Sequence, residues 1–159
     1  MEMLLKLLSE DARLSLEQLA SLTGQSETAV AQRMDELKNE GVIVGYQAVV
    51  NWEKAGLEKV QSIIEVRISP KRDFGFDEFA DAIARFPEVE NVYLMSGGYD
   101  ISITIHGASF RDIAMFVAKR LSPMESVLST ATHFVLKTYK ERGIILAGKP
   151  EDERGFASL

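Results

Sequence analysis

The sequence predicts an α+β chain of two domains, an N-terminal winged helix-turn-helix and a C-terminal ferredoxin-like βαββαβ domain. Apolar residues in the first 50 positions recur at helical spacing. From Val60 on, the apolar pattern repeats every two residues, as in a strand. From there, strand and helix patterns alternate in the order strand, helix, strand, strand, helix, strand. With 159 residues, 46% of them hydrophobic, the chain is long enough for two small domains, each with its own core.

The first two helices are indicated by leucine spacing and by a capping pattern. Leucines recur near helical spacing within Glu2–Ser9, which predicts a first helix. Ser15 precedes a second apolar stripe, and Gln18 follows three residues later, so the pair is typical of a capping box at a helix start. Gly24 then permits a backbone angle that other residues resist, which places a turn after the second helix.

A third helix is expected from Ser26, as its cap, to about Glu40, with Gly41 ending it. Its apolar stripe consists of Val30, Met34 and Leu37. Val42–Val44 and Tyr46–Val50 flank Gly45 and alternate weakly, which is consistent with the two short strands of a wing. We therefore assign residues 1–50 to the helix-turn-helix domain. Residues 51–60 have no clear period and are expected to be a linker.

The second domain, residues 61–140, begins with a strand of alternating pattern. Even-numbered positions from Val60 to Ile68 line one face, and Pro70 stops the strand. An amphipathic helix from Phe76 to Phe86 follows and ends at Pro87. In a βαββαβ fold the helices cover one face of the sheet, so the other face, with Ile63, Glu65 and Arg67, is expected to meet a second subunit.

The rest of this domain repeats the strand and helix patterns. Val89–Met95 and Ile101–His106 are expected as strands joined by a turn at Ser96-Gly97-Gly98, followed by a helix over Phe110–Leu121. Val127–Tyr139 is expected as a long fourth strand. In the C-terminal extension, residues 141–159, Ile144–Leu146 could add an edge strand, and 150–159 is expected to be a mobile tail.

The polar face of the third helix is the candidate DNA reader. Glutamine can read adenine edges, arginine can grip guanine or phosphate, and threonine can contact bases. The residues expected to contact DNA are Ser26, Thr28, Gln32 and Arg33. A plain helical hairpin with a solvated polar face fits the same spacing equally well. Charge favours that alternative, because residues 1–50 hold four basic and eight acidic side chains, a formal charge of −4.

The order of short motifs along the chain resembles the Lrp/AsnC, or feast/famine, family of transcription regulators. In the N-terminal half the shared features include Arg13 and Ser15, Leu19-Ala20, Gly24, Ser26, the Val30 to Arg33 spacing, and Gly41-Val-Ile with Gly45-Tyr46. In the C-terminal half they are Ser96-Gly-Gly-Tyr-Asp100 and Thr130–Lys137. The resemblance spans about Leu4 to Lys140. It departs at Asp35-Glu36, where the family often has a basic residue, and in a shortened first helix.

The resemblance implies a regulator that binds double-stranded DNA as homodimers, which can close into octamers. It also implies a small-molecule effector, commonly an amino acid, at a contact between dimers. The residues that would hold it are Gly97, Gly98, Tyr99 and Asp100. Backbone N–H groups can take a carboxylate and Asp100 can take an ammonium. The same four residues can equally be a plain hairpin turn.

Several other classes of function are disfavoured by the sequence. There is no cysteine, and His106 and His133 have no carboxylate pattern around them, so neither a disulfide framework nor a metal site is expected. No catalytic constellation and no cofactor motif is present. No apolar run approaches the length of a membrane span, and the first residues do not resemble a signal peptide, so a cytoplasmic location is expected.

Two alternatives to a DNA-binding regulator stay open at this point. The acidic third helix is compatible with a sensor or assembly protein of the same fold that does not bind DNA. Some sirohaem decarboxylases also resemble this family in both domains. Their polyanionic substrate requires a site rich in arginine and histidine, and with two histidines in the chain this alternative is the least favoured.

Overall fold

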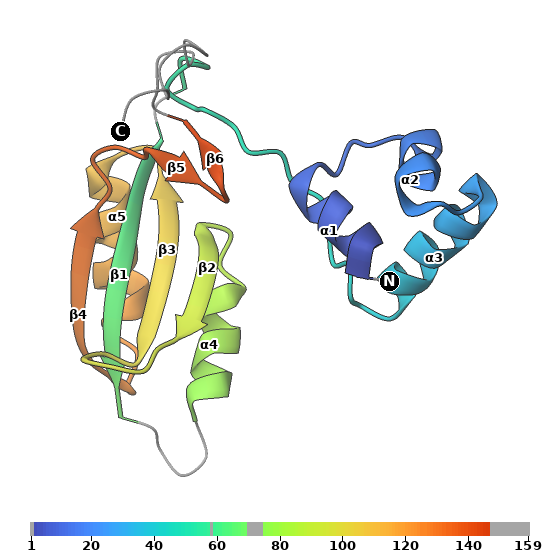
Figure 1. Ribbon diagram of the computed structural model, residues 1–159. Helices are drawn as coiled ribbons and strands as arrows, with labels where there is room; N and C mark the ends of the chain where they lie inside the picture. The colour runs from blue at the N-terminus through green and yellow to red at the C-terminus, as the bar shows by residue number, and fades with distance from the viewer. Residues whose placement is uncertain (1, 58, 70–74, 147–159) are drawn as a thin grey trace, which may run out of the picture. The chain divides into compact units, whose positions relative to one another are not determined.

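The computed structural model of the chain (Figure 1) describes residues 2–57, 59–69 and 75–146. It contains two compact units, Met1–Val49 and Val50–Leu159. The segment 51–60, expected as a linker, falls within the second unit. The predicted mobile tail at 150–159 lies outside the described residues. Within those ranges, no helix has both the length and the apolar character needed to cross a membrane.

The first unit holds three helices, α1 (Glu2–Glu10), α2 (Leu16–Thr23) and α3 (Glu27–Asn39). The capping box expected at Ser15 is confirmed. The Ser15 hydroxyl accepts a hydrogen bond from the Gln18 backbone N–H at 3.2 Å, and the Ser15 N–H donates to the Gln18 side chain at 2.8 Å. These two bonds satisfy N–H groups that have no partner inside the helix.

The turn between α2 and α3 depends on Gly24, which has φ +68°. A side chain is strained at this angle, so glycine is the residue that lets the chain reverse here. Ser26 then caps α3, and Gly41 follows its end with φ +71°. The three helices enclose one small apolar core, formed by Leu4, Leu8, Leu19, Val30 and Leu37.

The expected wing strands, Val42–Val44 and Tyr46–Val50, do not form. No strand is present between residues 42 and 50. A two-stranded hairpin is marginal in water unless it packs an apolar face against a core. Here the Val44 side chain is 92% exposed, and only Ile43 of this segment packs against the helical core. The prediction of a helix-turn-helix was therefore right, and that of its two wing strands was wrong.

The second unit contains a four-stranded antiparallel sheet in the order β2-β3-β1-β4. The strands are β1 (Val60–Ile68), β2 (Val89–Leu94), β3 (Ile101–Gly107) and β4 (Val127–Phe134). Helices α4 (Phe76–Ala84) and α5 (Phe110–Phe116) lie on one face of the sheet, as Figure 1 shows. The ferredoxin-like arrangement predicted from the alternation of periods is confirmed.

The core of this unit lies between the sheet and the two helices. Alternate residues of β1 and β3 face the helices and are fully buried, as the period of two predicts. The buried cluster comprises Ile64, Val66, Ile68, Ile101, Ile103, Ile105, Phe79, Ile83, Ile113, Phe116 and Leu121. On the opposite face, Ile63 is 39% exposed and Tyr93 is 55% exposed, so apolar side chains remain at the surface.

The C-terminal strands differ from the expectation. β4 ends at Phe134 rather than Tyr139, because its partner β1 begins at Val60 and the last ladder bond runs from the Val135 N–H to the Gln61 carbonyl. Ile144–Ile145 forms β6, but it pairs with β5 (Lys140–Glu141) in a separate two-stranded hairpin rather than at the edge of the main sheet. The helix expected to reach Leu121 is α-helical to Phe116 and continues as one π-helical turn, η1 (Val117–Leu121).

Replacing Ser15 by alanine should destabilise the first unit by about 1 kcal/mol, because the capping box is lost. Amide hydrogen exchange along α2 and α3 measures this stability separately from that of the second unit. Ser21→Ala is the matched control, since Ser21 is exposed inside α2 and has no capping role. If both variants exchange equally fast, the capping box does not support the helix-turn-helix.

Candidate DNA interface and ligand turn

The N-terminal end and exposed face of α3 carry the residues expected to read DNA, but three of the four already have partners within the chain. Thr28 and Gln32 are exposed one helical turn apart. The Ser26 hydroxyl accepts a hydrogen bond from the Ala29 N–H at 3.2 Å, so it serves as the helix cap. The Gln32 amide donates to Glu36 at 3.2 Å. Of the four predicted contact residues, Thr28 has no side-chain hydrogen bond within the described chain.

Arg33 is held by two acidic side chains of the same helix region. Its Nη1 atom lies 2.7 Å from Glu36 Oε2 and 3.4 Å from Glu40 Oε1. The hydrogen bond to Glu36 raises the pKa of Arg33 and, in turn, lowers the pKa of Glu36. Because the pKa of Glu36 is lowered, this ion pair persists at neutral pH and is lost only as the pH falls below the usual carboxyl range.

These contacts mean that α3 presents little net positive charge to a duplex. Lys38, the other cation of the helix, has its Nζ 3.9 Å from Asp35 Oδ1. DNA phosphates would therefore compete with carboxylates for the cations of α3. Arg33 was expected to contact DNA, but its two acidic partners were not predicted from the sequence. Glu36 and Glu40 follow Arg33 by three and seven residues, and this helical spacing was the sequence signal that could have predicted the ion pairs.

The predicted ligand turn is fixed to the sheet by Asp100. The Asp100 carboxylate accepts a hydrogen bond from the Ile68 backbone N–H at 2.9 Å, at the end of β1. The Asp100 N–H donates to the Val66 carbonyl at 3.0 Å, and its carbonyl accepts from the Met95 N–H at 2.8 Å. Asp100 thus bonds backbone groups around the turn, as the plain-hairpin interpretation expects, and it also ties the β2–β3 turn to β1, which the sequence did not predict.

The two glycines of the turn differ in conformation. Gly97 has φ +149°, in the region that favours glycine, so the turn itself requires it. Gly98 has no positive φ, and a Cβ built there would meet nothing within 4 Å. The fold of one subunit therefore does not explain why position 98 lacks a side chain.

The two histidines each face one carboxylate. His106 Nδ1 lies 3.1 Å from Glu90 Oε2, and His133 Nε2 lies 3.5 Å from Glu65 Oε1. The two pairs involve different strands of the sheet. Among the residues for which positions are described, no three His, Cys, Asp or Glu side chains gather in a way that could hold a metal ion.

The fold and these surfaces define a class of protein: a DNA-binding regulator with a helix-turn-helix and a separate ligand-binding domain. The sequence model of a winged helix-turn-helix DNA-binding domain matches residues 2–44, and that of the Lrp/AsnC ligand binding domain matches residues 61–145. The chain belongs to the Lrp/AsnC family, and it is a DNA-binding transcription regulator of that type.

Similar proteins support this assignment over nearly the whole chain. The HTH-type transcriptional regulator YugG of Bacillus subtilis is 45% identical over 152 residues, 95% of this chain and 92% of that protein. The proline dehydrogenase transcriptional activator of Rhizobium radiobacter is 33% identical over 141 residues, 89% of this chain and 90% of that protein.

Solved structures show the same fold. The regulator NMB0573 of Neisseria meningitidis, crystallised as a complex with L-Met, superposes with a TM-score of 0.71 at 25% identity, covering 89% of this chain and 91% of its own. LrpA of Mycobacterium tuberculosis gives a TM-score of 0.72 at 26% identity, covering 88% of this chain and 92% of its own.

The partners of Arg33 lead to a prediction about DNA binding. Arg33→Ala should weaken binding to the DNA upstream of the protein's own gene by about 1–3 kcal/mol if Arg33 contacts a base. The double variant Glu36→Gln with Glu40→Gln should strengthen binding, because Arg33 then has two fewer carboxylates competing with the duplex. Fluorescence anisotropy at stated salt measures both effects.

The matched control is Glu10→Gln with Glu17→Gln, which changes the charge equally on α1 and α2. If it strengthens binding as much as the Glu36/Glu40 variant, the effect is one of net charge only. Unchanged binding by Arg33→Ala would show that α3 is not the reader.

Proposed function

We propose that the regulator binds double-stranded DNA as an assembly of dimers and that an amino acid at the Gly97–Asp100 turn controls this binding. The observation that carries the proposal is α3, a capped helix that displays Thr28 and Gln32 beyond a tight turn. The proposed readers on α3 are Ser26, Thr28, Gln32 and Arg33. A protein with this role works beside the DNA, so we place it in the cytoplasm.

The open face of the sheet supports dimer formation. It carries Ile63 and Tyr93, which are exposed, beside the charged groups Glu65 and Arg67. Burying apolar side chains of this kind against a second copy is favourable. A dimer presents two α3 helices, which can read half-sites about one helical turn apart. Several dimers, up to an octamer, would add avidity to modules that bind weakly alone.

The effector part of the proposal rests on the turn and on a relative. The NMB0573 regulator was solved with L-Met, which makes an amino acid the first ligand class to test. The proposed ligand residues are Gly97, Gly98, Tyr99 and Asp100. Position 98 is open to a ligand or a neighbouring subunit, and the charge of Asp100 suits an ammonium. A ligand that prefers one assembly shifts the population towards it and changes DNA occupancy.

The direct test is binding of the purified protein to its own upstream DNA at stated salt, with and without each amino acid. We expect at least one amino acid to change the affinity. Asp100→Asn should abolish this response, because it removes the charge while keeping an oxygen to accept the Ile68 N–H. Asp100→Ala should also abolish it, at the further cost of that hydrogen bond.

The outcomes of this test separate the candidate functions. Amino-acid binding without DNA binding would indicate a sensor rather than a DNA regulator. An equal response in wild type and Asp100→Asn would show that Asp100 is not a ligand and that the turn is only a hairpin. DNA binding that no amino acid alters would leave a regulator without this class of effector and would contradict the proposal.

Assembly gives a second prediction. The protein should be larger than a monomer at micromolar concentration in light scattering, and Ile63→Glu should shift it towards the monomer by burying a charge in the interface. Val44→Glu is the control, since Val44 is exposed on the other unit. Gly98→Val should reduce assembly beyond the dimer while each subunit stays folded, because nothing in the subunit obstructs a side chain there. A wild-type monomer would refute this prediction.

A further inference from the structure

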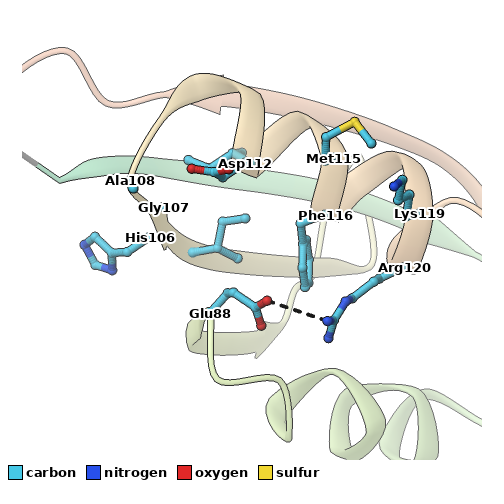
Figure 2. Close-up of a pocket in the computed structure, with 11 residues that line it drawn as sticks. Glu88, His106, Gly107, Ala108, Asp112, Met115, Phe116, Lys119 and Arg120 are labelled. Carbon is cyan, nitrogen blue, oxygen red and sulfur yellow. Dashed lines mark ion pairs between the residues drawn. The ribbon is translucent and has the colours of Figure 1, made fainter.

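A pocket of about 500 Å³ lies on the helix side of the second unit, along α5 and η1 and beside the start of β2 (Figure 2). All of its lining residues belong to this one unit. It is separate from the proposed ligand turn. The turn precedes β3 and the pocket includes Gly107 at the other end of that strand, roughly 20 Å away for a strand of this length.

Glu88 supplies an unsatisfied acceptor in this pocket. Its Oε2 atom is buried and has no hydrogen-bond partner, while its Oε1 atom lies 3.9 Å from Arg120 Nη2. Figure 2 shows Glu88 and Arg120 reaching towards each other across the pocket. The Glu88 side chain as a whole is 38% exposed, so its carboxylate is a partly solvated acceptor at the pocket wall, which a ligand that carries N–H groups can meet.

Two cations, Lys119 and Arg120, line the pocket from the π-helical turn η1. In a regular α-helix, Arg120 would lie on the same face as the buried Phe116, one turn later. The Ser122 N–H instead bonds the Val117 carbonyl, five residues back, and it is Leu121 that is buried. Lys119 and Arg120 are both exposed, and the Arg120 Cζ atom lies 5.0 Å from the centroid of the Phe86 ring. Such π turns are frequent at functional sites.

Part of the remaining wall is apolar, and His106 and Asp112 line the pocket beside it. Phe116 is buried and meets Phe86 edge to face, with ring centroids 5.5 Å apart. Met115, one residue earlier in α5, is partly exposed along the rim. The volume falls in the range of small-molecule sites in proteins. The pocket thus joins an acceptor, a cation and an apolar surface.

We propose that this pocket is a second ligand site, which binds a small zwitterion with an apolar body, such as an apolar α-amino acid. The ammonium pairs with the Glu88 carboxylate, the ligand carboxylate pairs with Lys119, and the apolar side chain packs on Met115 and Phe116. Lys119 has no ion pair in the described part of the chain, so it is available for this role. The site adds to the proposed function and does not depend on ligand binding at the turn.

Two methionines allow the pocket and the turn to be observed separately. Met115 lines the pocket, and the Met95 N–H bonds the Asp100 carbonyl at the turn. In the full-length protein labelled with [¹³C-methyl]methionine, the two methyl signals can be assigned with Met115→Leu and Met95→Leu. L-Leucine is the probe, titrated to about 10 mM, which detects affinities into the millimolar range.

We expect the Met115 signal to shift saturably with L-leucine and to do so equally in Asp100→Asn. Glu88→Gln and Lys119→Gln should each weaken this binding about tenfold or more, since each removes a charged hydrogen bond. Asp81→Asn, an exposed carboxylate of α4 outside the pocket, should leave it unchanged. Unaltered methyl spectra without ligand confirm that each variant is folded.

The zwitterion itself is tested with two analogues of leucine. N-acetyl-L-leucine lacks the ammonium and 3-methylbutylamine lacks the carboxylate, so neither should shift Met115 at the concentration where leucine saturates. Equal shifts with both analogues would overturn the assignment of the two charged contacts. If the Met115 signal never shifts with L-leucine, the proposal of a second site is wrong. It is also wrong if the Met115 and Met95 signals both stop shifting in Asp100→Asn. A shift of Met95 alone would support the turn and reject the pocket.

Discussion

The excess of acidic side chains in the DNA-binding unit is the constraint on which the rest of the molecule depends. Residues 1–50 carry eight acidic and four basic side chains, and Arg33 is paired with Glu36 and Glu40. Binding to phosphates gains most of its free energy from released counterions, which requires cations on the protein. One such unit cannot obtain much affinity in this way. Under the proposed function, affinity comes from several units held together and from base contacts along α3.

The second unit is built in a way that can meet this need. Its helices cover one face of the sheet and complete the core, and the other face exposes Ile63 and Tyr93, where we propose that a second copy binds. The turn fixed by Asp100 lies at one end of β3, and the pocket with Glu88 reaches the other end. Under the proposed function, a ligand at either end contacts a domain whose assembly sets how many α3 helices meet the duplex at once.

The sequence predicted the elements whose signals are local. Ser15 with Gln18, Gly24 and the alternation in β1 each act within a few residues, and the structure confirms them. The wing strands and the end of β4 were wrong because pairing depends on what lies beside a strand, not on its own pattern. The partners of Arg33 were readable from spacing but were missed. Glu88 and Arg120 come from distant segments, so no periodicity could have placed them together.

Hydroxyl-radical footprinting of the full-length protein on its upstream DNA, repeated at two salt concentrations, tests the central claim most directly. If binding depends on several weakly charged units, protection should recur about every 10–10.5 base pairs on one face of the duplex. The salt dependence per subunit should then be shallow. A single short protected stretch with the steep salt dependence of 6–10 phosphate contacts would contradict the account, because one unit would then be binding through charge alone.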